Sequence, residues 1–125
     1  MSILITEDRI STNAQPAFVI GESTNVILTK DTAIQAQSNG CGVDVTANDA
    51  FFSVQGLVVS ANRSAINVAT QNEISITRDG LVASNNTAIN LSGATNSVVN
   101  DGTVNSGFRA VNSVQNEQDI LNNGT

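Results

Sequence analysis

The chain of 125 residues contains no histidine, tryptophan or tyrosine, and it has only one proline and one cysteine. Without histidine it lacks the side chain that most often acts as a general base near neutral pH and that most often binds transition metals. Without tryptophan and tyrosine it lacks the aromatic anchors of many binding sites. The single Cys41 cannot form an internal disulfide, so the fold must be stable without one. We therefore expect a protein that is not an enzyme.

Basic residues are also scarce, because five Lys and Arg stand against eleven Asp and Glu, for a net charge of −6. They form no basic patch, so we expect neither nucleic acid nor an anionic membrane surface as a partner. The N-terminal segment MSILITEDRIS has no basic stretch and only a short apolar run, which indicates neither a secretory signal nor a membrane span. The abundant residues are Asn, Thr, Ser, Val, Ile and Ala, a mixture typical of short strands joined by polar corners.

A repeat organises the chain. Gly80 and Gly102 are each followed by Val alternating with a small residue, then by Ala-Ile-Asn or Ala-Val-Asn, and then by an apolar pair. A period of this length indicates a solenoid of stacked units. Backward steps of 22 to 24 residues recover less regular copies, whose first residues are Asp8, Thr32, Gly56, Gly80, Gly102 and Gly124.

Apolar residues recur at equivalent places in the copies, as stacked coils require. Two residues after the start of each copy stand Ile10, Ile34, Val58, Val82 and Val104. A second segment contributes Phe18, Val43, Ile66, Ile89 and Val111, and a third contributes Leu28, Phe52, Ile76, Val98 and Ile120. Small residues follow the first set, at Thr12, Ala36, Ser60, Ser84 and Ser106. Apolar and polar residues alternate within each segment, which indicates strands and not helices.

The sequence thus predicts an all-β protein with a single domain at 1–125, a single-stranded parallel β-helix (β-solenoid) with three short strands per coil. Residues 1–7 should form a partial N-terminal coil or lid, 8–123 five coils of 22–24 residues, and 124–125 the start of a further coil. Right-handed winding is expected from the usual hand of parallel crossovers. Leucine-rich repeats have a similar period, but the leucines here are too few for their pattern.

Two polar columns are candidates for function. Asp31, Asp79 and Asp101 precede the starts of copies, and as stacked carboxylates they are candidates to share calcium between coils. Solvated turn aspartates are the favoured interpretation, because the glycine- and aspartate-rich nonapeptide of calcium-binding β-rolls is absent. We therefore expect no cofactor other than this calcium candidate.

The second polar column follows Asp44 and consists of Asn67, Asn90 and Asn112. It predicts a structural ladder, with side-chain amides bonded along the stack. A carbohydrate-binding face is the alternative, but such a face normally includes exposed aromatic residues and none aligns with this column. Ice binding is disfavoured because no threonine array runs through the coils.

The two ends of the stack suggest a role. A β-helix exposes unpaired backbone and core at its ends, and nothing after Ile120 and Leu121 resembles the caps that usually cover them. Uncapped ends favour head-to-tail stacking, which gives a filament when the contact does not close. The residues expected at this polymer interface are Ile3, Leu4, Ile5, Phe108, Val111, Ile120 and Leu121. For Phe108, folding back over its own coil is an equal alternative.

The motif N-D-G-T-V-N-S followed by A-V-N, and D-G-L-V-A-S followed by T-A-I-N-L-S-G, resembles the degenerate repeats of secreted bacterial β-solenoids. Autotransporter passengers and filamentous haemagglutinin-like adhesins are the families concerned, and the resemblance covers residues 56–125 best. It implies an extracellular or cell-surface location and a non-enzymatic role. The sequence departs from the pattern of those families in its length, and we expect from it neither their signal peptide nor their outer-membrane translocator.

The expected function is therefore a self-assembling structural subunit of an extracellular bacterial fibre or matrix, joined head to tail by its uncapped ends. Its expected partners are copies of itself and other surface components, with no nucleic acid and no membrane insertion. The alternative is a binding module, a β-solenoid segment of a larger surface adhesin.

Overall fold

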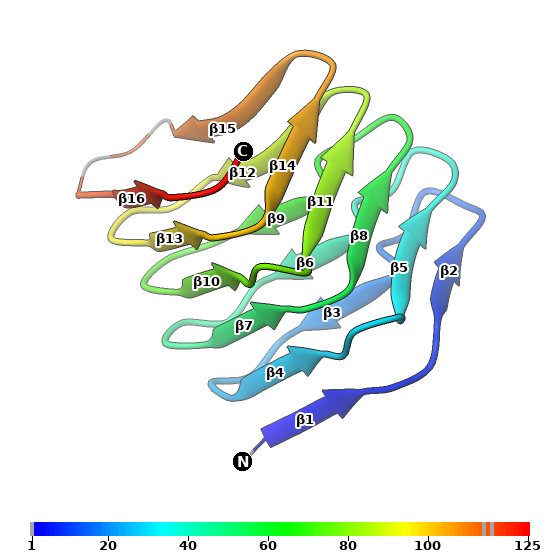
Figure 1. Ribbon diagram of the computed structural model, residues 1–125, viewed down its shortest axis with the longest axis horizontal. Helices are drawn as coiled ribbons and strands as arrows, with labels where there is room; N and C mark the ends of the chain where they lie inside the picture. The colour runs from blue at the N-terminus through cyan, green and yellow to red at the C-terminus, as the bar shows by residue number, and fades with distance from the viewer. Residues whose placement is uncertain (1, 114, 116) are drawn as a thin grey trace.

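The computed structural model, which describes residues 2–113, 115 and 117–125, confirms the predicted fold class (Figure 1). Its strands are β1 (Ser2–Ile5), β2 (Arg9–Ser11), β3 (Phe18–Ile20), β4 (Asn25–Leu28), β5 (Ala33–Ala36), β6 (Val43–Val45), β7 (Phe51–Val54), β8 (Leu57–Ser60), β9 (Ile66–Val68), β10 (Glu73–Ile76), β11 (Leu81–Ser84), β12 (Thr87–Leu91), β13 (Ser97–Asn100), β14 (Thr103–Ser106), β15 (Arg109–Ser113) and β16 (Asp119–Asn122). None of the described residues lies in a helix that could cross a membrane.

Three parallel sheets form the walls of the solenoid (Figure 1). Sheet A has six strands in the order β1-β4-β7-β10-β13-β16, sheet B has five in the order β2-β5-β8-β11-β14, and sheet C has five in the order β3-β6-β9-β12-β15. Each strand therefore pairs with the strand three places along the chain. Parallel strands need a crossover connection, and here the rest of each coil supplies it. The result is a stack of about five coils with three strands per coil.

The core is a set of apolar columns inside the three sheets. The second-strand column is confirmed, because Phe18 pairs with Val43, Val43 with Ile66, and Ile66 with Ile89, which in turn pairs with Val111. Side chains of the middle coils are completely buried in these columns, and Phe52 is the largest of them. Ladders of β-branched and aromatic residues at the strand spacing of about 4.8 Å are what hold the coils together.

The predicted third-strand column was wrong in its pairing. One observed column is Val26, Phe52, Ile74, Val98 and Ile120, and the other is Leu28, Val54, Ile76, Asn100 and Asn122. The connection from sheet A to sheet B alternates between four residues, as at 29–32 and 77–80, and two, as at 55–56 and 101–102. Counting back from the next copy therefore slipped by two residues in alternate coils. Side chains in a strand alternate with period two, so a slip of two residues keeps a side chain on the same face. All five residues of the predicted column therefore still point inward.

The first-strand column was wrong in the first coil. Arg9, not Ile10, pairs with Ile34, and Ser11, not Thr12, pairs with Ala36. This coil spans 25 residues from Arg9 to Ile34, one more than the 24-residue step used to align it. A slip of one residue exchanges the faces of a strand. As a result Ile10 points outward and is 57% exposed, while Arg9 takes the inward position.

The short corners require glycine for steric reasons. A Cβ atom on Gly56 would collide with the carbonyl oxygen of Thr32, and one on Gly102 with that of Gly80. Neither glycine has a positive φ, so the requirement is the close approach of the neighbouring coil and not the left-handed conformation.

Candidate functional site

The C-terminal end of the stack is an open apolar hollow of about 220 Å³. It is lined by the inward residues of the last coil and their neighbours, Val98, Asn100, Val104, Ala110, Val111, Ile120, Asn122 and Thr125. Ile120 is 46% exposed, whereas Val98, which precedes it in the same column, is 1% exposed. The end therefore presents a cross-section of the core, with β14, β15 and β16 as the edge strands of their sheets.

The N-terminal end differs, because a charged residue lies over the core. Arg9 occupies the inward column above Ile34, and its guanidinium carbon lies 5.6 Å from the centroid of the Phe18 ring. A cation held over an aromatic face in this way is stabilised by the ring quadrupole. Arg9 and Phe18 together thus form a partial cover, which we call the Arg9–Phe18 cover.

The structure distributes the predicted interface residues over three environments. Ile3 and Ile120 face inward at opposite ends of sheet A, and Leu4 and Leu121 face outward beside them. Ile5 is only 1% exposed and packs inside its own chain on Leu28. Val111 is partly buried against the core, in the wall of the C-terminal hollow.

Phe108 is 65% exposed in the corner between β14 and β15. The guanidinium carbon of Arg109 lies 4.6 Å from the centroid of its ring. The side chain is therefore stacked with its neighbour beside the hollow and does not line it. Two exposed apolar residues near the opposite end, Ile10 and Val19, were missed by the sequence analysis. An alignment of the first coil in the correct register would have placed Ile10 on the outward face.

The predicted asparagine ladder is present on the outer face of sheet C. The amide nitrogen of Asn112 donates to Asn90 Oδ1 at 2.9 Å, that of Asn90 to Asn67 Oδ1 at 2.9 Å, and that of Asn67 to Asp44 Oδ1 at 3.1 Å. Arg109 donates to Asn112 Oδ1 at 2.8 Å. A carboxylate only accepts and a guanidinium only donates, so these two residues fix the direction of every amide in the ladder.

A second set of amides, which the repeat pattern did not predict, lies in the corner between sheets C and A. Asn72 and Asn96 are buried there, each directly after a residue with positive φ, Gln71 and Thr95. Asn96 Oδ1 accepts from the backbone N–H of Asn72 at 2.9 Å, and Asn72 Oδ1 accepts from that of Ala50 at 2.8 Å. Each side chain thus satisfies buried backbone groups of the preceding coil. The recurring signal was an asparagine directly before the third strand.

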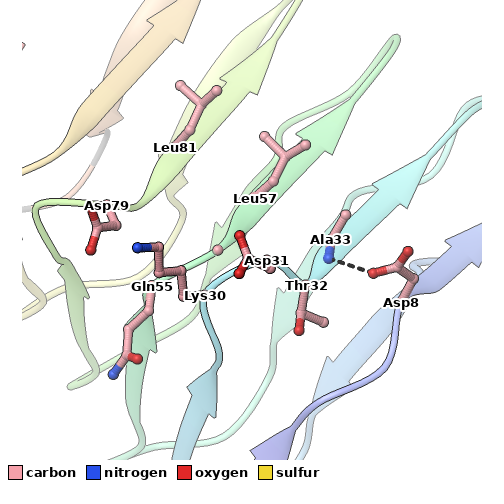
Figure 2. A pocket seen from close by; sticks show the side chains of 10 residues that line it. Asp8, Lys30, Asp31, Thr32, Ala33, Gln55, Leu57, Asp79 and Leu81 are labelled. Atoms are coloured by element: carbon pink, nitrogen blue, oxygen red, sulfur yellow. Dashed lines mark hydrogen bonds between the residues drawn. The ribbon is translucent and has the colours of Figure 1, made fainter.

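The calcium candidates lie along the corner between sheets A and B. The long corners at 29–32 and 77–80 stand on either side of the short corner at 55–56, leaving a groove of about 460 Å³ (Figure 2). Asp31 and Asp79 line this groove with Lys30. The coil that contains the short corner lies between Asp31 and Asp79, so these two carboxylates are not in adjacent coils. The third candidate, Asp101, accepts a hydrogen bond at its Oδ1 from Asn123 Nδ2 at 3.1 Å. In the described part of the chain no three carboxylates or other metal-binding groups gather into a cluster that could hold a metal ion.

A further carboxylate in the groove has a structural role. Asp8 turns toward the backbone of the next coil and accepts a hydrogen bond from the N–H of Ala33 at 2.8 Å (Figure 2). Asp8 lies immediately before β2, and its side chain supplies the acceptor for the backbone N–H of Ala33, the first residue of β5. The groove is therefore a consequence of alternating corner lengths, with at least one of its acids used to hold the first coil.

The thiol of Cys41 is half-buried in a corner of the second coil. Burial raises its pKa above the usual value, and the carboxylate of Asp44 raises it further, while Arg63 and the backbone at Ser64 lower it. Because the thiolate is the reactive form, we expect Cys41 to be a poor nucleophile at neutral pH.

We predict that iodoacetamide labels folded Cys41 more slowly than Cys41 unfolded in urea, and that the labelling rate keeps rising with pH beyond the usual thiol pKa of about 8.5. The folded state holds the thiol proton more tightly, so its stabilising contribution is complete below the unfolded pKa and is lost as the pH rises through the folded pKa. Mass spectrometry of timed labelling reactions measures the rate. Equal labelling of folded and unfolded protein at neutral pH would contradict the prediction.

No protein-family model matches the chain, and no match was found among curated proteins or among solved structures. The resemblance to bacterial adhesin repeats therefore depends on the repeat motifs alone.

Proposed function

We propose that the protein is a self-assembling structural subunit of an extracellular bacterial fibre or matrix, joined head to tail through the ends of its solenoid. The observation that carries the proposal is the open C-terminal hollow, surrounded by the edge strands β14, β15 and β16. The extracellular bacterial setting is supported by the resemblance of the repeat motifs in residues 56–125.

The chemistry of this end favours another coil as the occupant. The hollow is lined mainly by Val, Ile and Ala side chains, and the equivalent residues one coil earlier are completely buried by the coil above them. The edges of β15 and β16, and the part of β14 beyond its contact with Thr125, offer backbone N–H and C=O groups that a further parallel strand would pair. A stacked coil satisfies both needs at once, whereas a small ligand would fill the hollow and leave the three edges open.

A second candidate, a segment of a larger surface adhesin, is favoured by one specific contact. The backbone of Thr125 accepts from the N–H of Val104 at 2.9 Å and donates to the carbonyl of Gly102 at 2.9 Å. These residues begin a further turn on the edge of sheet B, so coils of a longer chain would cover the hollow in the same way.

A matched pair of charge substitutions tests the proposal. Val104 points into the hollow and Asn105, its neighbour in β14, points outward. We predict that Val104→Lys abolishes end-to-end assembly, because the ammonium would be buried without a partner, and that Asn105→Lys leaves assembly nearly unchanged. Sedimentation velocity over a concentration series and electron microscopy of the same samples provide the measurement.

The two substitutions add the same charge to the same strand, so a difference between them reports on the end surface. Filaments of the unmodified chain that Asn105→Lys retains and Val104→Lys loses would support the proposal. A chain that stays monomeric at every concentration would refute self-assembly and favour the adhesin segment.

A further inference from the structure

We infer that the position of β1 on β4 is a docking site for β16 of a second copy, so that assembly proceeds by exchange of one strand. This inference deepens the proposed function and depends on it. It arises from the unequal strand numbers of the three sheets, six in sheet A against five in sheets B and C.

Strand order along the spiral shows the consequence. Within one chain β1 of sheet A comes directly before β2 of sheet B, and β16 of sheet A is the last strand after β14 and β15. When a second copy continues sheets B and C, its β2 lies against β14 and its β3 against β15. Along the spiral, one position in sheet A lies between β15 of the first copy and β2 of the second. Both β16 of the first copy and β1 of the second would occupy this position. One of the two strands must leave.

The sequences of the two strands show that they are interchangeable. β1 is Ser-Ile-Leu-Ile and β16 is Asp-Ile-Leu-Asn. In both, the isoleucine faces inward on a valine, since Ile3 pairs with Val26 and Ile120 with Val98. In both, the leucine faces outward, where Leu4 lies beside Ile27 and Leu121 beside Val99. The surface of β4 that accepts β1 therefore also fits β16.

The last position of the strand differs between the two, because Asn122 would replace Ile5 on Leu28. The column has a precedent for this contact, since Asn100 already lies on Ile76 while its Oδ1 accepts from the N–H of Gly102 at 3.0 Å. An asparagine at this position can thus stack on an aliphatic side chain and turn its amide to the corner.

The exchange keeps the number of strand pairs in sheet A and adds strand pairs in sheets B and C. Pairing in sheet A is conserved, because β16 replaces β1 on β4. Sheets B and C gain new pairs, and Val111 meets the ring of Phe18 in the register that Val43 now uses. Two contributions oppose the exchange. The backbone bonds of Thr125 to Gly102 and Val104 on the edge of β14 must break before β2 of the second copy can pair there. Arg9 would also meet Val104 inside the joined core. A buried guanidinium without a partner is costly, so the Arg9–Phe18 cover must open before the ends join.

A disulfide between positions that only the exchange brings together tests the inference. The test uses Ile27→Cys and Leu121→Cys in a Cys41→Ala background. Within one chain these positions lie four strands apart in sheet A, about 19 Å between strand backbones. They become neighbours at about 4.8 Å when β16 pairs with β4 of another copy. We expect a ladder of covalent multimers after mild oxidation of the assembled protein. The control pair Leu4→Cys with Ile27→Cys should form a disulfide within one chain, because β1 lies beside β4 in the free protein.

Two changes at the N-terminal end provide a second measurement. Removal of residues 1–6 frees β4, and Arg9→Val removes the inward charge, so each should lower the concentration at which filaments form by about tenfold or more. Lys30→Val, which removes a charge from an outward corner, is the control and should leave this concentration nearly unchanged.

The outcomes separate this inference from the proposed function. Filaments that form without the 27–121 disulfide, or that weaken when residues 1–6 are removed, would overturn strand exchange and leave self-assembly standing. If no variant and no concentration gives filaments, the proposed function fails and the exchange with it. Disulfide-linked multimers together with a lowered assembly concentration would support both.

Discussion

Asn96→Ala should lower the free energy of unfolding by about 3 to 5 kcal/mol, because it takes the hydrogen-bond partner from the N–H of Asn72 and from the carbonyl of Ala69. The Asn96 side chain is 1% exposed. Its Nδ2 donates to the carbonyl of Ala69 at 2.7 Å and of Gly93 at 3.2 Å, and its Oδ1 accepts from the N–H of Asn72. Alanine can replace none of these bonds.

Asn90→Ala is the matched control, since it removes the same amide from the half-buried ladder on the outer face of sheet C. Water can reach Asn67 and Asn112 there, so we expect a loss of about 1 kcal/mol or less. Urea unfolding followed by circular dichroism gives both values. Equal losses for the two variants would contradict the distinction between a corner amide that supports the backbone and an amide on the surface.

Phe52→Ala should also cost about 3 to 5 kcal/mol, from lost burial and from the cavity that remains. Phe52 is the largest completely buried side chain, and it lies in the column between Val26 and Ile74. Coils on both sides fix the height of that column, because their backbones are joined by ladder hydrogen bonds. The stack therefore cannot collapse around the missing ring without breaking pairing in sheet A.

Phe51→Ala makes the same chemical change one residue earlier. Phe51 is only half-buried and begins the outward series of β7, so its loss should cost about 1 kcal/mol or less. The ratio of the two effects, measured by thermal and urea unfolding, tests the assignment of inward and outward faces in β7. A larger loss for Phe51→Ala than for Phe52→Ala would show that the assignment is reversed.

The regular coils were predictable because local pattern and global fold agree in them. The orders Ile-Asn-Val in β9 and Ile-Asn-Leu in β12 alternate strictly, and stacking such segments buries their apolar side chains. The asparagine ladder followed from the same alignment, since residues in one column lie one strand spacing apart. Neither prediction required knowledge of the corners.

Predictions failed where they depended on the lengths of corners. Ile10 and Arg9 exchange faces if the first coil is one residue longer than its neighbours, and nothing within the segment Arg9–Ser11 reveals which length applies. The predicted third-strand column combined residues of two observed columns for the same reason. The corner after β4, which contains Leu28, has four residues, and the corner after β7, which contains Phe52, has two. The buried amides of Asn72 and Asn96 were not predicted, because an asparagine before a strand resembles an ordinary turn residue until the neighbouring coil is placed.

The sequence by itself determined that this chain is a three-sided parallel β-solenoid, because a period of 22 to 24 residues with strand alternation has few other ways to bury its apolar side chains. Only the tertiary structure decided how its two ends differ. It placed Arg9 over Phe18 at one end, opened a hollow beside Val104 at the other, and gave sheet A one strand more than sheets B and C. The physical reason is that the face of each side chain depends on every residue counted through the preceding corners, and that count is fixed only when neighbouring coils pair.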